Sequence, residues 1–335
     1  MSATVNVIIH ESQFPENVRR DLLESLRSRQ INHKFHYDSY KQTQKWLALH
    51  EAYSPARRDP DCLATYEHGF KATVKKIKSN TVSVIGLGCG GGQKDVRLLK
   101  LLKRAGKKIS YTPCDVSAAM VLVARRAAVK VLPAQNCFPF VCDLATADDL
   151  SASLATRHPS LVTFFGMIPN FEPQIILPKL ASLLQPKDLL LFSANLAPGK
   201  NYDSGLKKIL PQYDNALTRD WLMAFLLDMG IEQGDGELRF TIENDPDGHD
   251  LKRVAANFHF TRAREIRVDS ERFKFRAGHV VRLFFSYRYT LERAKRILAA
   301  HGIEVLDSWI TKSEEEGVFL CQQNLPLAKT PRRKG

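Results

Sequence analysis

From residue 81 onward, short apolar runs alternate with longer stretches whose apolar residues recur at helical spacing. The first run, Thr81–Leu87, is rich in β-branched residues and ends in glycines, which is typical of a buried parallel strand. We predict further strands at 109–114, 138–142, 161–165 and 189–192, and helices at 95–105, 117–129, 147–154 and 174–184. This alternation predicts an α/β fold with a Rossmann-like, mostly parallel sheet and helices on both of its faces.

The alternation stops after residue 195. The pattern there predicts a helical stretch over 202–230 and antiparallel strands at 239–242, 254–259 and 280–289. The core pattern then returns with a helix at 291–300 and strands at 303–310 and 318–322. We therefore predict a core made of 71–195 and 290–325, an α+β substrate lobe made of 1–70 and 196–289, and a disordered basic tail over 326–335.

A glycine-rich loop over residues 85–92 follows the first core strand. Glycines at a strand-to-helix turn let backbone N–H groups and the helix N-terminus approach a ligand closely. Gly86, Gly88 and Gly91 also fit the G-x-G-x-x-G fingerprint of dinucleotide-binding folds. Asp115 ends the second core strand, where an acid hydrogen-bonds the ribose hydroxyls of an adenosine ligand. The competing interpretations are a purely structural turn at the glycines and a helix cap at Asp115.

NAD and S-adenosylmethionine both suit these two features, and the last two predicted strands decide between them. Only residues 311–317 separate these strands. A parallel crossover needs a dozen or more residues, so the two strands form an antiparallel hairpin. A terminal antiparallel hairpin on a parallel sheet is characteristic of class I methyltransferases and foreign to nicotinamide domains. The sequence therefore predicts S-adenosyl-L-methionine as the cofactor and methyl transfer as the reaction.

Composition narrows the possible partners and the compartment. The chain has 335 residues, of which 44% are apolar, and no stretch approaches the roughly 20 apolar residues of a membrane span. The six cysteines form no C-x-x-C pair and no zinc-ligand spacing, so we expect reduced thiols, a cytoplasmic location and no metal. The net charge of +13 favours an anionic partner, but four basic residues lie in the tail and the others are scattered. We therefore do not expect a nucleic-acid partner, and the oligomeric state stays open.

Several segments of the chain resemble motifs of one enzyme family. They are 35–38 (Phe-His-Tyr-Asp), 52–57 (Ala-Tyr-Ser-Pro-Ala-Arg), the glycine loop, 111–117 (Tyr-Thr-Pro-Cys-Asp-Val-Ser), 165–173 (Phe-Gly-Met-Ile-Pro-Asn-Phe-Glu-Pro), 213–215 (Tyr-Asp-Asn) and 285–290 (Phe-Ser-Tyr-Arg-Tyr-Thr). Together they span nearly the whole chain, and the segment around Asn170 is the strongest single match. On these motifs the chain resembles the histidine-specific methyltransferases, which trimethylate the α-amino group of histidine on the way to ergothioneine.

This resemblance implies roles for individual residues. It implies that the hydroxyls of Tyr37 and Tyr213 hold a substrate carboxylate and that Asn170 holds the α-amine. An amide oxygen accepts an N–H bond without stabilising ammonium as strongly as a carboxylate does, which suits a reaction that needs a neutral nitrogen. The expected cofactor-binding residues are Gly86, Gly88, Gly90, Asp115, Gly166 and Asp143, the last of them on the adenine amino group. The other expected substrate-binding residues are Tyr53, Ser54, Phe284 and Ser286.

Three positions depart from the family pattern. Ser54 stands where the family has a tyrosine that contacts the amine, Phe284 where an acid grips the imidazole ring, and Gly86 where a glutamate begins the glycine motif. A phenyl ring in place of the acid makes the side-chain pocket apolar and disfavours histidine. We hypothesise an N-methyltransferase for the amine of an amino acid, or of an amino-acid-derived small molecule, that is less polar than histidine. The alternatives are a histidine Nα-methyltransferase, a nucleic-acid methyltransferase and an inactive S-adenosylmethionine-binding protein.

Overall fold

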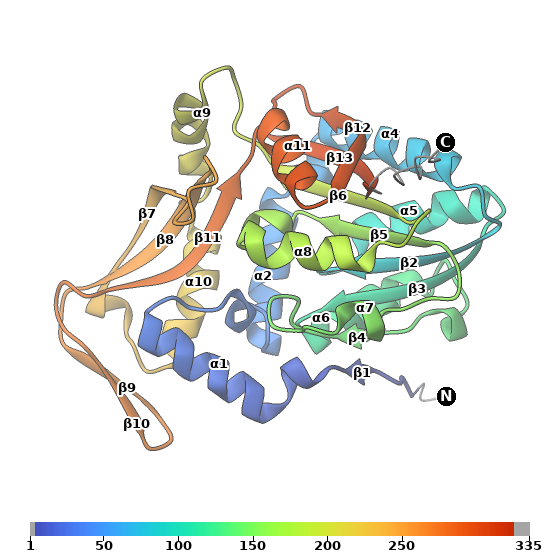
Figure 1. The fold of residues 1–335 in the computed structure, drawn as a ribbon. Coiled ribbons are helices and arrows are strands. Elements are labelled where there is room, and N and C mark those ends of the chain that lie inside the picture. The colour runs from blue at the N-terminus through green and yellow to red at the C-terminus, as the bar shows by residue number, and fades with distance from the viewer. Residues whose placement is uncertain (1–3, 325–335) are drawn as a thin grey trace, which may run out of the picture.

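The computed structural model describes residues 4–324, and an eight-stranded sheet forms the centre of the molecule (Figure 1). Its strands, in spatial order, are β1 (Ile8–Ile9), β4 (Phe140–Val141), β3 (Lys108–Asp115), β2 (Thr81–Leu87), β5 (Ser160–Phe165), β6 (Leu189–Asn195), β13 (Glu316–Gln323) and β12 (Ile303–Ile310). The strands from β1 to β6 run parallel to their neighbours, whereas β13 runs antiparallel to both β6 and β12. The predicted parallel sheet and the predicted terminal hairpin are both confirmed.

Helices cover both faces of this sheet. One layer consists of α4 (Pro60–Lys76), α5 (Gln93–Arg104) and α6 (Ala118–Ala128), and the other of α7 (Leu150–Ser153), α8 (Pro173–Leu183) and α11 (Leu291–Ala300). Successive residues of a strand face opposite sides. Val82 and Val84 of β2 therefore join the apolar core under the first layer, whereas Ile85 and Leu87 join the core under the second.

The remaining elements form a second lobe, which lies on the left of Figure 1. Its strands are β7 (Gly236–Asn244), β8 (Lys252–Phe260) and β11 (Val280–Arg288), paired antiparallel in the order β11-β8-β7, and a separate hairpin of β9 (Arg264–Val268) and β10 (Glu271–Phe275). Its helices are α1 (Pro15–Ser28), α2 (Tyr40–Tyr53), α9 (Tyr202–Ile209) and α10 (Ala216–Asp228). The short helix α3 (Pro55–Arg58) lies beside α4, and its buried Ala56 belongs to the apolar core of the sheet. Trp221 and Phe225 of α10 pack with Phe258 and Phe260 of β8, so this lobe has an aromatic core of its own.

The predicted boundary at residue 71 differs from the packing. It falls inside α4, and Tyr66 and Phe70 of this helix belong to the apolar core of the sheet. Strand β1, from the segment assigned to the substrate lobe, pairs with β4 at the edge of the core sheet. Parts of the first 70 residues therefore belong to the core. The predicted tail over 326–335 lies outside the described residues.

The second lobe adds detail to one local prediction and an element that was not predicted. The predicted helical stretch 202–230 consists of two helices, which are separated at Pro211 because proline lacks the N–H that a continuous helix would use. The second helix begins where the side chain of Asn215 accepts the backbone N–H of Thr218 at 2.9 Å. The hairpin of β9 and β10 has no counterpart among the predicted strands, although apolar residues alternate over 264–275.

The positive charge gathers on one layer of helices. Residues 71–130 hold 14 Lys and Arg against only Asp95 and Asp115, both buried, and so carry +12 of the chain's +13. Because α5 packs against both α4 and α6, many of the basic residues that are scattered along the sequence lie on neighbouring helices. Among the described residues, none of the helices has the length and apolar character needed to cross a membrane.

Candidate active site

Two cavities meet at the loop that follows β2. The first has a volume of about 440 Å³, and Asp115, Asp143 and Lys34 are among the residues that line it. The second has a volume of about 740 Å³ and is lined by the predicted residues Tyr53, Ser54, Gly166, Tyr213, Phe284 and Ser286, among others. Both cavities are lined by Tyr37, Trp46, Gly88, Gly90, Met167 and Asn170. The two cavities therefore share one junction.

The glycine loop leaves no room for side chains at this junction. Gly88 and Gly90 have φ angles of +54° and +49°, which few residues other than glycine adopt. A Cβ atom on Gly88 would lie 2.6 Å from Cγ of Met167, and one on Gly90 would lie 3.0 Å from the ring of Trp46. Two separate constraints, backbone conformation and close packing, thus require glycine at both positions.

Gly86 differs from the other predicted glycines because it lines neither cavity. A Cβ atom there would lie 2.5 Å from Oδ2 of Asp95. The buried carboxylate of Asp95 accepts hydrogen bonds from the hydroxyls of Tyr111 and Thr163, both at 2.7 Å. An acid from α5 thus fills the space that a side chain on β2 would need. Gly86 therefore makes room for this network rather than contacting a ligand in either cavity.

Asp115 stabilises the loop before α6 and also lines the first cavity. Its Oδ1 accepts the backbone N–H of Ser117 at 3.1 Å, and Ser117 itself caps α6 by accepting the N–H of Met120, so Asp115 is not the helix cap. Its Oδ2 accepts the backbone N–H of Gly90 at 2.9 Å and so ties β3 to the glycine loop. Burial outweighs these hydrogen bonds and raises the pKa of Asp115 to about 6. The carboxylate keeps further lone pairs toward the first cavity, where it can accept hydroxyl groups.

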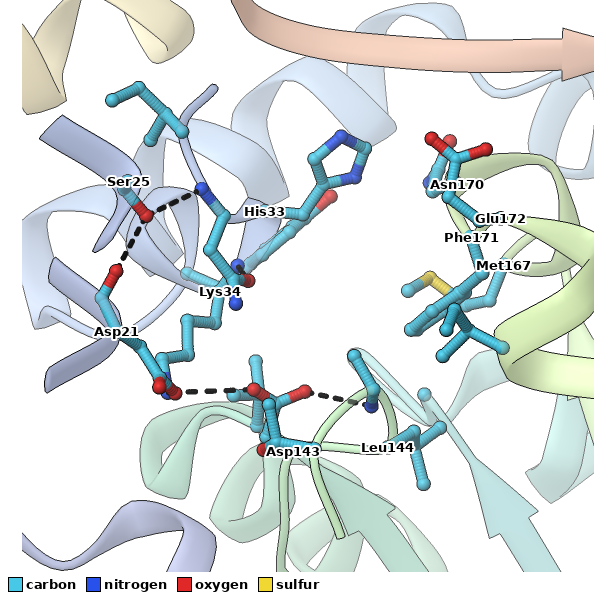
Figure 2. A pocket seen from close by; sticks show the side chains of 18 of the residues that line it. Asp21, Ser25, His33, Lys34, Asp143, Leu144, Met167, Asn170, Phe171 and Glu172 are labelled. Carbon is cyan, nitrogen blue, oxygen red and sulfur yellow. Dashed lines mark hydrogen bonds and ion pairs between the residues drawn. The ribbon is translucent and has the colours of Figure 1, made fainter. Parts of the chain in front are cut away.

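Asp143 offers the first cavity an acceptor that has no hydrogen-bond partner. Its Oδ1 accepts the backbone N–H of Ala145 at 2.9 Å, whereas the buried Oδ2 accepts no hydrogen bond within residues 4–324. The nearest charge is Lys34, whose Nζ lies 3.4 Å from Oδ2 and 2.5 Å from a carboxylate oxygen of Asp21 (Figure 2). A buried acceptor of this kind suits an amino group such as that of adenine. Lys34 has no local sequence signal, because its partners come from distant elements.

Asn170 lies at the junction with its amide free. It ends a short 3-10 turn, Ile168–Asn170, after β5 and the bend at Gly166, whose φ is +73°. Its backbone N–H donates to the carbonyl of Met167, but within the described residues its side-chain amide makes no hydrogen bond. Figure 2 shows this side chain beside that of Glu172, at the wall of the first cavity. The amide can therefore bind a ligand that reaches between the cavities.

One wall of the second cavity combines a phenyl ring with a chain of polar groups. Phe284 and Ser286 of β11 face the same cavity, as their spacing predicts. The hydroxyl of Tyr213 donates to Ser286 at 3.0 Å and accepts Nε–H of Arg288 at 3.0 Å. Tyr53 lies at the wall with 54% of its surface exposed. Arg288 has no signal in the sequence, because nothing in the local pattern of β11 marks it as buried.

Comparison with known proteins decides the family. A family profile described as histidine-specific, S-adenosylmethionine-dependent methyltransferase matches residues 18–323. The chain belongs to this family. The N-methyltransferase imqF of Aspergillus flavus is 27% identical in a match that covers 80% of this chain and 73% of that protein.

Solved methyltransferases also match this member of the histidine-specific family at low identity. Magnesium protoporphyrin IX methyltransferase of Synechocystis PCC 6803, with bound S-adenosylhomocysteine, has a TM-score of 0.44 and 13% identity, covering 85% of this chain and 95% of that chain. The glycopeptide N-methyltransferase MtfA, complexed with S-adenosylmethionine, has a TM-score of 0.39 and 12% identity, covering 77% and 93%. The observed sheet order with its antiparallel final strand is that of the class I methyltransferase fold.

This family member is therefore an enzyme of the S-adenosylmethionine-dependent N-methyltransferase type. Its cofactor supplies a methyl group bound to a positively charged sulfur. The lining of the first cavity suits the adenosine part of such a cofactor, since it offers a carboxylate at Asp115, an oxygen of Asp143 that accepts no hydrogen bond within residues 4–324, and a glycine loop that leaves its backbone accessible.

Proposed function

We propose that the enzyme methylates the amine of an amino acid, or of an amino-acid-derived small molecule, whose side chain is less polar than histidine. One observation carries this proposal: the unpaired amide of Asn170 and the phenyl ring of Phe284 line the same cavity. The amide suits an amine, and the ring suits an apolar side chain. The size of the cavity, about 740 Å³, also suits a small molecule.

We infer that the cofactor occupies the first cavity and reaches the junction past the glycine loop. Asp115 would accept the ribose hydroxyls, and Oδ2 of Asp143 would accept the adenine amino group. Gly88 and Gly90 line both cavities, so the reacting end of a ligand can pass them into the second cavity. Gly166 lines the second cavity near this path.

The substrate amine would then lie at Asn170. The amide oxygen accepts one N–H of the neutral amine and so directs the nitrogen lone pair toward the methyl group, and such positioning is worth several kcal/mol of the barrier. The acid beside it, Glu172, does not compete for the amine. Its oxygens already bind the guanidinium of Arg253 at 2.8 Å and the hydroxyl of Tyr287 at 2.5 Å. The amine is therefore held without a free carboxylate that would stabilise its protonated form.

The apolar wall supports a substrate other than histidine. The ring of Phe284 stacks on His33, with centroids 5.0 Å apart, and packs edge-on against Trp221 at 5.7 Å. None of these faces offers a carboxylate to an imidazole N–H. A buried imidazole N–H without an acceptor would cost about 1–3 kcal/mol. An aromatic or aliphatic side chain would instead gain from burial against Phe284.

Histidine remains the second candidate, because other acids line the same cavity. Glu315 and Glu316 lie on its wall near the start of β13. Glu315 accepts a hydrogen bond from Gln212 at 2.9 Å, and Glu316 binds the hydroxyl of Tyr66. Either carboxylate would have to leave these partners to bind an imidazole, which makes it a weaker acceptor than the family's own acid.

Exchange of Phe284 tests the proposal. The ratio of kcat/KM for L-histidine to that for L-phenylalanine is measured for wild type, Phe284→Glu and the double variant with Ser54→Tyr. Restoring the acid should raise this ratio by about one to two powers of ten, because an imidazole N–H regains a charged acceptor. Phe284→Leu is the matched control and should keep the wild-type preference. A wild-type enzyme that already prefers histidine would contradict the proposal.

A further inference from the structure

Arg288 is a buried cation without a carboxylate partner. The residue is 6% exposed, and within residues 4–324 no carboxylate oxygen lies within 4.0 Å of its guanidinium. The other deeply buried cations differ in this respect. Arg253 pairs with two glutamates and Lys34 with two aspartates. An unpaired buried charge is costly, so the exception at Arg288 requires an explanation.

The hydrogen bonds of Arg288 leave part of its guanidinium free. Nε donates to the hydroxyl of Tyr213 at 3.0 Å, and Nη1 donates to the carbonyls of Leu196 at 3.1 Å and Glu315 at 3.5 Å. Nη2 donates to no described residue. Since a guanidinium carries five N–H donors, two of them remain available. Arg288 lines the second cavity, so a ligand there can reach this charge.

The hydroxyl of Tyr213, in contrast, has no free hydrogen with which to donate to a ligand. Its hydroxyl donates to the oxygen of Ser286 and accepts from Arg288, so its single O–H is already used. The resemblance to the family implies that Tyr213 itself binds the carboxylate. In the observed arrangement, the free donors at this wall are instead the Ser286 hydroxyl and Nη2 of Arg288.

We propose that Arg288 binds the carboxylate of the substrate, with the hydroxyl of Ser286 as a second donor. This inference rests on the proposed function and deepens it, because it restricts the substrates to amines that carry a free carboxylate. Amino acids joined to a carrier or to a peptide through that carboxylate would be excluded. Tyr213 then acts as a positioning residue that fixes the guanidinium and turns the Ser286 hydroxyl toward the cavity.

A second carboxylate, that of the methionine part of the cofactor, could also occupy this region. Lys94 also lines the second cavity beside the glycine loop, where its Nζ donates to the hydroxyl of Tyr66 at 2.6 Å and lies 3.6 Å from Glu316, so it is a second cation within reach of that group. Arg288 belongs to the wall formed by Tyr213, Phe284 and Ser286, on the lobe that faces the substrate. The experiment must separate the two carboxylates.

Calorimetry with each amino acid and its carboxamide separates the substrate carboxylate from that of the cofactor. Wild type, Arg288→Met and Arg288→Lys are saturated with S-adenosylhomocysteine and titrated with the twenty amino acids and their carboxamides. In wild type at least one amino acid should bind about tenfold or more tightly than its carboxamide, because a charge-assisted pair is lost in the amide. Arg288→Met should lose this preference and Arg288→Lys should keep part of it. Arg276→Met, an exposed arginine that lines neither cavity, should match wild type.

Two results would overturn the inference. In the first, no amino acid binds wild type more tightly than its carboxamide, a comparison that does not depend on the folding of any variant. In the second, Arg288→Met retains the preference. If this variant also loses affinity for S-adenosylhomocysteine, the guanidinium serves the cofactor instead of the substrate. If amino acids bind with the expected preference but no methyl group reaches their amine, the proposed function fails while the role of Arg288 stands.

Discussion

Among single residues, Asp115 links the fold most directly to the proposed cofactor cavity. Its carboxylate joins the end of β3, the start of α6 and the glycine loop through two backbone hydrogen bonds, and it still faces the first cavity. We therefore propose that the residue binds the cofactor in addition to its structural role. Substitutions should separate the two.

Replacing Asp115 should weaken cofactor binding. We expect Asp115→Ala to reduce the affinity for S-adenosylhomocysteine by about 1.5–3 kcal/mol, because hydrogen bonds from the ribose hydroxyls to a charged acceptor are lost. Calorimetry measures this change, with Asp148→Ala, an exposed acid that lines neither cavity, as the control. NAD should not bind wild type. Binding of NAD without binding of the nucleoside would refute the cofactor assignment.

The same carboxylate makes cofactor affinity depend on pH. Burial raises the pKa of Asp115 to about 6, and its titratable neighbours Tyr37 and Cys89 stay neutral because burial raises their pKa values too. The affinity for S-adenosylhomocysteine should therefore be full above about pH 7 and fall as the pH drops through 6, since a protonated carboxyl accepts hydrogen bonds poorly. Titrations from pH 5 to 8 measure this. Asp115→Asn should flatten the profile, and an unchanged profile in this variant would assign the effect elsewhere.

The sequence predicts which residues come together at the cavities where these residues belong to a contiguous motif. Gly88, Gly90 and Asn170 fall at the junction of the two cavities, as motif position and strand ends imply. Lys34 and Arg288 escape prediction because their environment is created by elements that are distant in the chain. Position 86 carries glycine where the family pattern has glutamate. Only the structure explains this difference, because the carboxylate of Asp95 occupies the space beside Gly86.

At the scale of elements, the loop between β2 and α5 carries the strictest requirement. Gly88 and Gly106 both have a positive φ, which is +74° at Gly106. In Gly88→Ala the added methyl group would also clash with Met167, whereas in Gly106→Ala it would point into open space. Both variants should lose about 1 kcal/mol of unfolding free energy from backbone strain. Only Gly88→Ala should also lose tenfold or more in affinity for S-adenosylhomocysteine. Calorimetry and thermal unfolding compare the two, and equal affinities would refute the close-packing argument.

Periodicity predicts the core strands and the terminal hairpin because buried parallel strands give compact apolar runs and short connections permit only one direction. It fails at boundaries, where tertiary packing decides. The helix α4 precedes the first core strand and looks no different from the helices of the other lobe, yet Tyr66 and Phe70 pack it onto the sheet. The interruption between α9 and α10 is different, because the local sequence alone, through Pro211, is enough to predict it.

At the scale of the whole molecule, the concentrated charge of α4, α5 and α6 should give weak binding to any polyanion. We expect low-affinity, sequence-independent RNA binding that decreases steeply with added salt. Charge reversal at Lys100 and Arg104 should reduce it, and the same change at Lys207 and Lys208 of α9 should not. Filter binding at several salt concentrations measures this. Tight binding together with methyl transfer to RNA would favour a nucleic-acid methyltransferase instead.

The central claim is that a small, amino-acid-like amine accepts the methyl group in the second cavity. A methyl-transfer screen tests it most directly: wild-type enzyme and S-adenosylmethionine are incubated with each of the twenty amino acids, and mass spectrometry locates the added methyl groups. We expect an aromatic or aliphatic amino acid to gain methyl groups on its α-nitrogen faster than histidine does. If histidine is the best substrate, the interpretation of Phe284 is wrong, and if no amino acid is methylated while the cofactor binds, the claim of a small amine substrate is contradicted.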